Sequence, residues 1–213
     1  MDLGLKDKIV LVTGGSKGIG RAVAEAFAVE GTKVAIAARG AEELEKVARE
    51  ISKNTGSEAL AIAADATKAD DIVRMTETTI KRFGTVHVLI NNAGGVGAFA
   101  PFEELTDDDW LQALNFNVLS AVRATRTVLP YMRKQKWGRI INISSESGSQ
   151  PDAFMPHYNA SKAAMNNLTK SLSKAYAKDG ILVNTVSPAF IMTPLVSGML
   201  KKMLLRTALR NSR

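Results

Sequence analysis

Short, continuously apolar segments alternate with longer amphipathic segments along most of this 213-residue chain. Apolar runs of this length predict strands that are buried on both faces, and such strands occur mainly in parallel sheets. The amphipathic segments between them predict helices, which cover both faces of a parallel sheet. The sequence therefore predicts one α/β domain over residues 1–213, with a sheet between two layers of helices.

The predicted elements follow one another at ordinary spacings. We expect strands at 8–13, 33–38, 58–64, 86–91, 138–144 and 181–187. We expect helices at 19–30, 41–52, 69–83, 107–136 and 156–178. Pro130 lies inside the fourth helix and predicts a kink there, because proline has no backbone N–H to donate. Ligands of parallel sheets bind beyond the carboxyl ends of the strands, so the loops after the strands are the candidate site.

Composition excludes several classes of protein. The chain has no cysteine, which excludes disulfides and thiolate metal sites, and its two histidines have no partnering cluster, so we expect no metal. No apolar run is long enough to span a membrane, and the first residues do not resemble a signal peptide, which favours a cytoplasmic protein. The net charge is 28 − 21 = +7. Five basic residues and no acid follow from Lys201; we interpret them as a solvated helix face, the alternative being a membrane- or nucleic-acid-binding tail.

A glycine-rich turn follows the first predicted strand, at Thr13-Gly14-Gly15-Ser16-Lys17-Gly18-Ile19-Gly20. Glycines allow a tight turn and a close approach of phosphate to backbone amides, and the helix N-terminus favours negative charge. The turn lacks the Lys-Ser/Thr ending of a P-loop, which argues against a nucleoside triphosphatase. We therefore predict a dinucleotide site that includes Gly14, Ser16, Lys17, Gly18, Ile19 and Gly20.

The end of the second strand indicates which dinucleotide is bound. NAD(H) sites place an acidic residue there to bind the ribose hydroxyls, whereas this chain has Ala38 and Arg39. A guanidinium attracts a 2′-phosphate, and Lys17 adds a second positive charge. We predict NADP(H) rather than NAD(H); the alternative is that both residues are solvated surface cations.

The next two loops offer further candidates. Asp65 carries a carboxylate that can accept a hydrogen bond from the adenine amino group, or it can cap the helix that begins near Ala69. The run Asn91-Asn92-Ala93-Gly94-Gly95 suits a backbone packed against a flat ligand, and we assign Asn91, Ala93 and Gly94 to the cofactor site. Taken alone, this run is equally consistent with a simple turn.

Tyr158 and Lys162 are four residues apart and therefore share one face of a helix. At roughly 4 Å and an effective dielectric of about 20, an ammonium stabilises a phenolate by about 4 kcal/mol and lowers the phenol pKa by roughly 3. We expect this effect to prepare Tyr158 for acid/base catalysis. The alternative is a half-buried tyrosine beside a solvated lysine.

Together these motifs resemble the short-chain dehydrogenase/reductase family, from about Lys6 to Leu195, and the wording around them resembles its 3-oxoacyl-carrier-protein-reductase-like branch. The resemblance implies a Rossmann fold with strand order 3-2-1-4-5-6. It implies hydride transfer between NADP(H) and a small ketone or secondary alcohol, in an enzyme acting on CH–OH donors. It also implies a homodimer or homotetramer, and we expect neither nucleic acid nor membrane as a partner.

The resemblance also implies individual roles. Tyr158 is the general acid and base, and Lys162 lowers its pKa and holds the nicotinamide ribose. Ser145 binds the substrate oxygen, with its neighbour Ser144 as the less favoured choice. Asn117 holds a water that relays protons to Lys162, and Asn115 is its competitor. Beside the nicotinamide we expect Pro188, Ile191 and Thr193.

The sequence departs from the family pattern in two places. Ala189 stands where glycine is usual, and no final strand can be read before Arg213. We expect residues 189–213 to form a partial substrate lid or tail, with the sixth strand at the sheet edge. The alternative function is a truncated relative that binds the dinucleotide without turnover. Glu146 either faces the substrate or is a surface acid.

Overall fold

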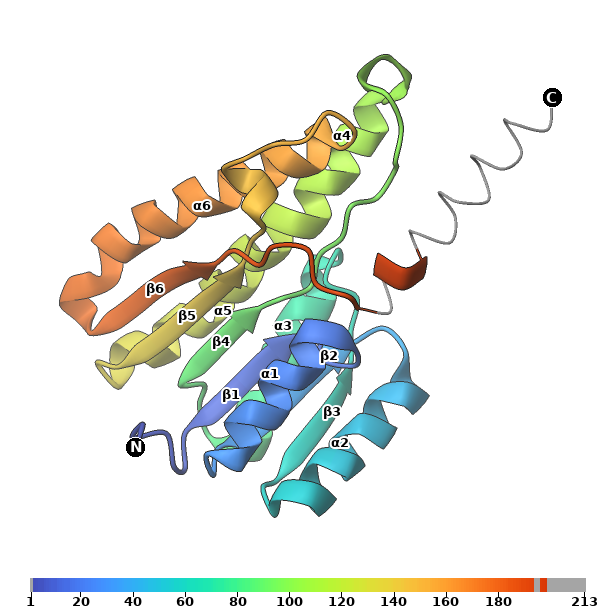
Figure 1. Ribbon diagram of the computed structural model, residues 1–213. Helices are drawn as coiled ribbons and strands as arrows, with labels where there is room; N and C mark the ends of the chain where they lie inside the picture. The colour runs from blue at the N-terminus through green and yellow to red at the C-terminus, as the bar shows by residue number, and fades with distance from the viewer. Residues whose placement is uncertain (1, 194–195, 199–213) are drawn as a thin grey trace.

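The computed structural model describes residues 2–193 and 196–198. Six parallel strands form one sheet in the order β3-β2-β1-β4-β5-β6, which confirms the predicted order (Figure 1). The strands are β1 (Ile9–Thr13), β2 (Lys33–Ala38), β3 (Ala59–Ala63), β4 (Val88–Asn91), β5 (Gly138–Ile143) and β6 (Ile181–Val186). The order reverses at β1, so the loops after β1 and β4 diverge there and leave room for a ligand.

Helices cover the sheet on two sides. The helices are α1 (Gly18–Val29), α2 (Ala41–Thr55), α3 (Ala69–Phe83), α4 (Asp107–Leu114), α5 (Ser120–Lys134) and α6 (Pro156–Tyr176). Side chains of α1 and α2 form one hydrophobic core, and side chains of α3 and α5, with two from α6, form the other. Short turns complete the chain: η1 (Phe102–Glu104), η2 (Asn115–Leu119), η3 (Glu146–Gly148) and η4 (Ala177–Asp179).

The central strand explains why the strands are continuously apolar. Every residue of β1 is buried, and Val10 pairs with Val34 of β2 and Val88 of β4. Val10 and Val12 belong to the core under α1 and α2, whereas Leu11 belongs to the core on the opposite face. Because successive side chains of a strand alternate between faces, a strand between two helical layers must be apolar at every position.

The predicted helix at 107–136 is interrupted. It consists of α4 and α5 joined by η2, a turn of π-helix, and Pro130 lies inside α5. The wider turn carries Asn117 into the interior, where its amide makes two hydrogen bonds with the backbone of Gly95. These bonds compensate for the irregular turn. No proline or glycine lies within 115–119, so local sequence gave no signal for it.

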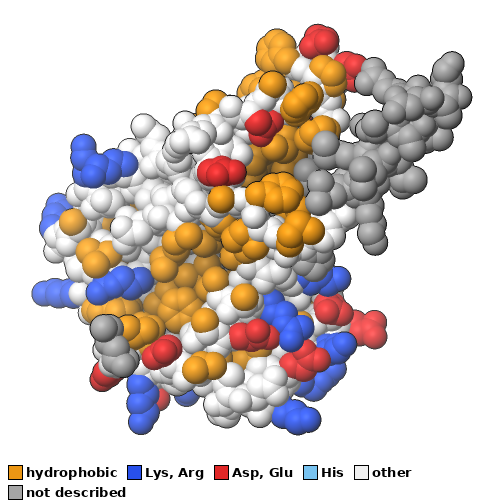
Figure 2. Space-filling view, in the orientation of Figure 1, with side chains coloured by type: hydrophobic (Ala, Val, Ile, Leu, Met, Phe, Trp, Pro, Cys, Tyr) orange, Lys and Arg blue, Asp and Glu red, His pale blue; other side chains and the backbone are white. Residues whose placement is uncertain are grey.

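β6 lies at the edge of the sheet formed by the described residues. Ile181 and Val183 are buried, whereas Leu182 and Val186 on the opposite face are 46% and 49% exposed. Figure 2 shows hydrophobic side chains gathered on this side of the molecule. The prediction that helices cover both faces therefore holds for β1 but not for this face of β6 among the described residues. None of the described helices has the length and apolar character needed to cross a membrane.

Candidate active site

One cavity of about 930 Å³ lies at the carboxyl ends of the strands, between the loops that follow them. The glycine turn and the loops after β2, β3, β4, β5 and β6 all contribute to its wall. The predicted site residues that line it are Gly14, Ser16, Lys17, Gly18, Ile19, Arg39, Asp65, Ala93, Gly94, Ser145, Tyr158, Lys162, Pro188, Ile191 and Thr193. Gly20, Asn91 and Asn117 are not among the residues that line it.

The glycine turn is shaped by backbone geometry. Gly14 and Gly18 have φ of 69° and 54°, in the region that favours glycine. The N–H of Gly14 donates to the carbonyl of Ala37 at 2.7 Å, which joins the turn to β2. A Cβ on Gly20 would collide with the carbonyl oxygen of Gly14. Gly20 therefore allows the start of α1 to lie directly against the turn.

Thr13 and Asn92 support this turn from below, a role that the sequence reasoning missed. The Thr13 hydroxyl accepts hydrogen bonds from the N–H groups of Asn92 and Ala93, both at 3.0 Å. The Asn92 amide donates to the carbonyls of Thr13 and Gly14 at 2.9 and 3.2 Å. The two loops that diverge at the switch point are thus held together by side chains. In the sequence, the only indication of this role is that a polar residue stands at the end of the first predicted strand and another follows the fourth.

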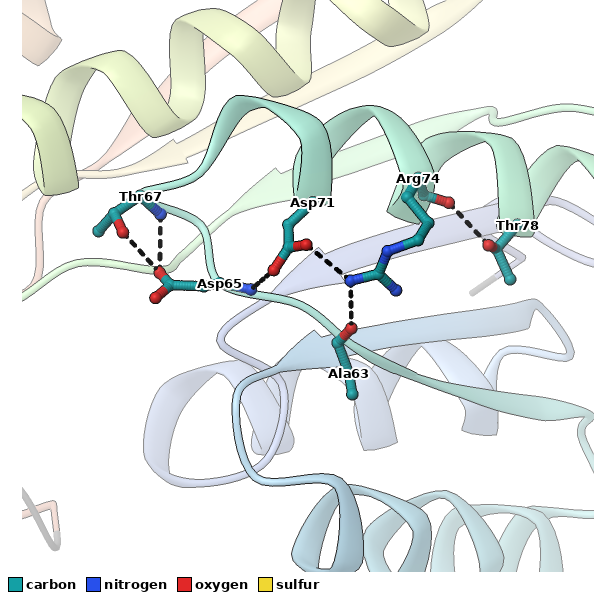
Figure 3. A network of polar contacts seen from close by, with 6 residues as sticks. All are labelled: Ala63, Asp65, Thr67, Asp71, Arg74 and Thr78. Atoms are coloured by element: carbon teal, nitrogen blue, oxygen red, sulfur yellow. Dashed lines mark hydrogen bonds and ion pairs between the residues drawn. The ribbon is translucent and has the colours of Figure 1, made fainter.

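Arg39 and Asp65 lie in neighbouring loops on the nucleotide side of the cavity. Asp65 Oδ1 accepts hydrogen bonds from the N–H and the hydroxyl of Thr67, at 2.9 and 2.8 Å (Figure 3). These bonds, with a smaller contribution from the Arg39 charge, lower the Asp65 pKa and keep it ionised. Asp65 does not act as the N-cap of α3, because that position belongs to Lys68.

Figure 3 also shows how this loop is attached to α3. The N–H of Asp65 donates to Asp71 Oδ2 at 2.7 Å. Arg74 donates to both Asp71 Oδ1 and the Ala63 carbonyl. The loop after β3 is therefore fixed at its backbone, and the carboxylate of Asp65 stays at the cavity wall.

Asn91 lies inside the protein rather than at the cavity. Its side-chain amide donates to Asn142 Oδ1 at 2.8 Å and to the Thr125 hydroxyl at 3.3 Å. Asn142 in turn donates to the Thr169 hydroxyl at 2.8 Å. These bonds connect β4, β5, α5 and α6, so the side chain of Asn91 joins strands and helices beneath the wall.

Burial dominates the electrostatics of Tyr158 and Lys162, and the expected lowering of the Tyr158 pKa is wrong for this structure. Desolvation raises the Tyr158 pKa, partly opposed by a hydrogen bond with Ser145. Burial lowers the Lys162 pKa from 10.5 to about 8. The ammonium lies 5.5 Å from the Tyr158 ring centroid and donates to the Ile143 carbonyl at 2.9 Å. The sequence estimate counted the attraction between the groups but omitted the cost of removing them from water.

The structure distinguishes the two neighbouring serines. Ser145 Oγ accepts a hydrogen bond from the N–H of Ser147 at 3.2 Å, and the two hydroxyls also lie 3.2 Å apart. Ser144 is buried, and its hydroxyl donates to the carbonyl of Lys162. Of the two serines, Ser145 is the one whose hydroxyl acts on Tyr158 and lowers its pKa, which favours Ser145 as the predicted partner of the substrate oxygen.

The two candidate asparagines, Asn117 and Asn115, also differ in their surroundings. Asn117 is fully buried, bonded to Gly95 and to the Ser161 hydroxyl, and a Cβ on Gly94 would lie near both Asn117 Oδ1 and Lys162 Nζ. Asn115 instead accepts a hydrogen bond from Arg123 at 2.7 Å. Asn117 is therefore the asparagine adjacent to the ammonium of Lys162.

The loop after β6 lies between the glycine turn and η3 at the cavity wall. A Cβ on Gly18 would lie 3.4 Å from Thr193 Cγ2, so this loop reaches the glycine turn. The N–H of Glu146 donates to the Pro188 carbonyl at 3.1 Å, which ties the loop to η3. Of the predicted lid at 189–213, residues 194–195 and 199–213 lie outside the described residues.

Residues of the substrate side complete the wall. Phe99 and Phe154 stack at 5.9 Å between ring centroids, and both line the cavity with Glu146 and Asp152. Sequence reasoning left Glu146 open and did not select the other three residues. They belong to irregular loops whose approach depends on the whole fold.

Comparison with known proteins places this site in a family. A family model described as short chain dehydrogenase matches residues 8–203. The chain is 36% identical over 196 residues to a 3-oxoacyl-[acyl-carrier-protein] reductase of Synechocystis, covering 92% of this chain and 78% of that protein. L-Sorbose reductase from Gluconobacter frateurii, solved with NADPH and L-sorbose, is 36% identical with a TM-score of 0.88, over 91% of this chain and 73% of that one.

A second similar structure contains NAD⁺ instead of NADPH. NAD⁺-bound xylitol dehydrogenase is 34% identical with a TM-score of 0.84, and the match covers 87% of this chain and 71% of that chain. The fold, the glycine turn and the Ser145–Tyr158–Lys162 group thus occur in a chain whose relatives are oxidoreductases. The chain therefore belongs to the short-chain dehydrogenase family of oxidoreductases.

Proposed function

We propose that this protein is an NADP(H)-dependent oxidoreductase that interconverts a ketone and a secondary alcohol, with Tyr158 as the general acid and base. The observation that carries the proposal is that a single cavity contains both halves of the chemistry. The glycine turn and Arg39 line one end, and Ser145, Tyr158 and Lys162 line the other.

The end of the cavity formed by the glycine turn and Arg39 has groups that suit the phosphates of NADP(H). The glycine turn presents backbone at the cavity wall, and the start of α1 adds the positive end of a helix dipole. Arg39 and Lys17 supply cations for a 2′-phosphate, and the carboxylate of Asp65, in the neighbouring loop, is already bonded to Thr67. Because the related structures include complexes with NADPH and with NAD⁺, the preference rests on these two cations.

At the catalytic end, NADPH supplies the hydride when bound. The raised pKa keeps the Tyr158 phenol protonated at neutral pH, so it has a proton to give to the oxygen of a ketone. Ser145 holds the same oxygen by its hydroxyl, and Ser147 fixes the orientation of Ser145 through the 3.2 Å bond. In the direction of alcohol oxidation, Tyr158 must first lose its proton.

Lys162 and Asn117 complete the proton pathway. With a pKa of about 8, Lys162 carries its charge at neutral pH and favours the phenolate once Tyr158 has donated. Asn117 is held rigidly by Gly95 and Ser161 and lies beside that ammonium. We infer that Asn117 and Lys162 return a proton to Tyr158 through water.

Several narrower assignments accompany this proposal. Pro188, Ile191 and Thr193 contact the nicotinamide end of the cofactor, and the described part of the loop after β6 borders the substrate. The substrate is a small carbonyl or alcohol compound, and the assembly is a homodimer or homotetramer. Residues 1–213 form a single domain in the cytoplasm.

The direct test is turnover. Purified protein is mixed with NADPH and a panel of β-keto esters and diketones, and the loss of NADPH absorbance is followed. The proposal expects oxidation of NADPH that depends on the ketone and is faster than oxidation of NADH. Tight NADPH binding without turnover of any ketone would support the inactive dinucleotide-binding relative instead.

A further inference from the structure

The substrate side of the cavity has an unusual charge distribution. Among the described residues that line the cavity, the cations are Lys17, Arg39 and Lys162. Lys17 and Arg39 belong to the loops after β1 and β2, at the nucleotide end. Lys162 is buried and its ammonium bonds to the Ile143 carbonyl. The described part of the substrate side therefore offers no lysine or arginine to a carboxylate on the substrate.

Glu146 places a carboxylate on that side, next to the reacting groups. It directly follows Ser145, and its N–H donates to the Pro188 carbonyl at 3.1 Å. Its own carbonyl accepts hydrogen bonds from Ser149 and Gln150, both at 2.8 Å. The backbone is thus fixed on both sides, whereas the exposed carboxylate has no hydrogen bond or ion pair with another described residue. Its negative charge is not neutralised by the described protein.

The surfaces opposite this charge are apolar. Phe99 and Phe154 stack with an interplanar angle of 16° and present carbon atoms to the cavity. Asp152 Oδ1 accepts a hydrogen bond from the N–H of Phe154 at 2.8 Å, which restrains the backbone at Phe154, and Asp152 adds a second carboxylate at the wall. This combination favours an uncharged substrate with an apolar body.

We propose that Glu146 is a specificity-determining residue that selects uncharged carbonyl substrates over analogues bearing a carboxylate. The inference rests on the proposed function, because it concerns the ketone bound at Ser145 and Tyr158. A substrate carboxylate at about 7 Å from Glu146, in an effective dielectric of about 40, is disfavoured roughly 5- to 10-fold. An ester of the same keto acid carries no charge and escapes this repulsion.

The test compares ethyl acetoacetate with acetoacetate, using NADPH and the intact protein. The ratio of kcat/KM for ester over acid is measured in the wild type and in Glu146→Gln. Glu30→Gln, at the C-cap of α1 and not among the residues that line the cavity, is the matched control. Because each ratio uses the same two compounds, their different intrinsic reactivity cancels between proteins.

Glu146→Gln is expected to lower the ester-to-acid ratio by about 5- to 10-fold, mainly through faster reduction of acetoacetate, whereas Glu30→Gln leaves it unchanged. Raising the salt from about 0.02 M to about 0.5 M should narrow the wild-type ratio more than that of Glu146→Gln, because the variant keeps the Asp152 carboxylate but not that of Glu146. If Glu146→Gln has the same ester-to-acid ratio as the wild type, including the case in which kcat/KM falls equally for both compounds, the inference about Glu146 is overturned. The proposed function is not affected by that result. If no ketone of any kind is reduced, the proposed function fails and the inference fails with it.

Discussion

The two halves of the sheet achieve their roles by different means. In the half formed by β1, β2 and β3, the buried polar side chains are threonines, and the site is made of glycine backbone and exposed cations. In the half formed by β4, β5 and β6, amides, an imidazole and an ammonium are buried. The polar side chains buried in that half include Asn91, Asn117, Asn142, His157, Asn159, Ser161, Lys162 and Thr169.

Under the proposed function, this difference separates cofactor binding in the nucleotide half from chemistry in the catalytic half. The nucleotide half binds charge at the surface with preformed backbone geometry, which costs little stability. The catalytic half keeps polar groups away from water, which shifts their pKa values and lowers stability unless hydrogen bonds compensate. Changes in one half should therefore alter cofactor choice, and changes in the other should alter turnover and stability.

The largest expected effect follows from removing the proton donor of the catalytic half. Tyr158→Phe should lower ketone-dependent turnover by about 10³-fold, because no other described group is placed to protonate the substrate oxygen. NADPH affinity, measured by fluorescence titration, should change by less than about twofold. A variant that turns over at the wild-type rate would remove Tyr158 from the mechanism, and a large loss of affinity would show that the halves are not independent.

The next largest effect concerns the nucleotide half. Arg39→Asp replaces attraction of the 2′-phosphate by repulsion, so the ratio of kcat/KM for NADPH over NADH should fall by about 10²-fold. The matched control is Arg49→Asp on α2, whose guanidinium pairs with Glu45 and does not line the cavity. An equal fall in both variants would attribute the effect to net charge rather than to Arg39.

Burial of Lys162 predicts a gain in stability when it is replaced. Lowering the pKa from 10.5 to about 8 corresponds to a cost of about 3 kcal/mol at neutral pH. Lys162→Met removes this cost and leaves the Ile143 carbonyl without its donor, which costs about 1 kcal/mol. The free energy of unfolding by urea should therefore rise by about 2 kcal/mol, while turnover is lost.

The same substitution has a pH signature with a definite sign. Between pH 8 and 10.5 the unfolded chain holds the Lys162 proton more tightly than the folded protein. The free energy of unfolding of the wild type therefore rises with pH across that window. The difference by which Lys162→Met is more stable than the wild type should shrink over the same range. A stability difference that does not depend on pH would show that the folded pKa is not lowered.

The smallest expected effect is in the pH profile of the wild type. Ketone reduction uses a protonated phenol whose pKa is raised, so Tyr158 does not limit the rate at neutral pH. Reduction should instead fall severalfold above a pH of about 8, where Lys162 loses its charge. In Lys162→Arg the decrease in the rate of ketone reduction should occur at higher pH. If the midpoint of the decrease is unchanged in this variant, a group other than Lys162 causes it.

The sequence predicted the fold, and the glycine turn and Arg39 do line one cavity, for a physical reason. Continuous apolar runs, glycine spacing and Arg39 at a strand end are local signals, and parallel topology brings the loops together at one edge of the sheet. The π-turn at Asn115–Leu119 could not be predicted, because it depends on Asn117 reaching the backbone of Gly95.

The catalytic half was predicted by residue type but not by environment. Spacing placed Tyr158 and Lys162 on one helix face, yet the direction of the Tyr158 pKa shift depends on burial, which the sequence does not report. Asn91 was assigned to the cofactor because it stands in a loop motif, whereas its amide bonds to Asn142 inside the protein. Phe154 and Asp152 have no periodic signal at all.

The most direct measurement is a crystal structure with NADPH and a bound ketone. In this complex we expect the Tyr158 hydroxyl and the Ser145 hydroxyl both to lie within about 2.6–3.2 Å of the ketone oxygen, with the ketone carbon facing the nicotinamide. A complex in which the nucleotide leaves the glycine turn, or in which Tyr158 stays beyond reach of the ketone, would contradict it.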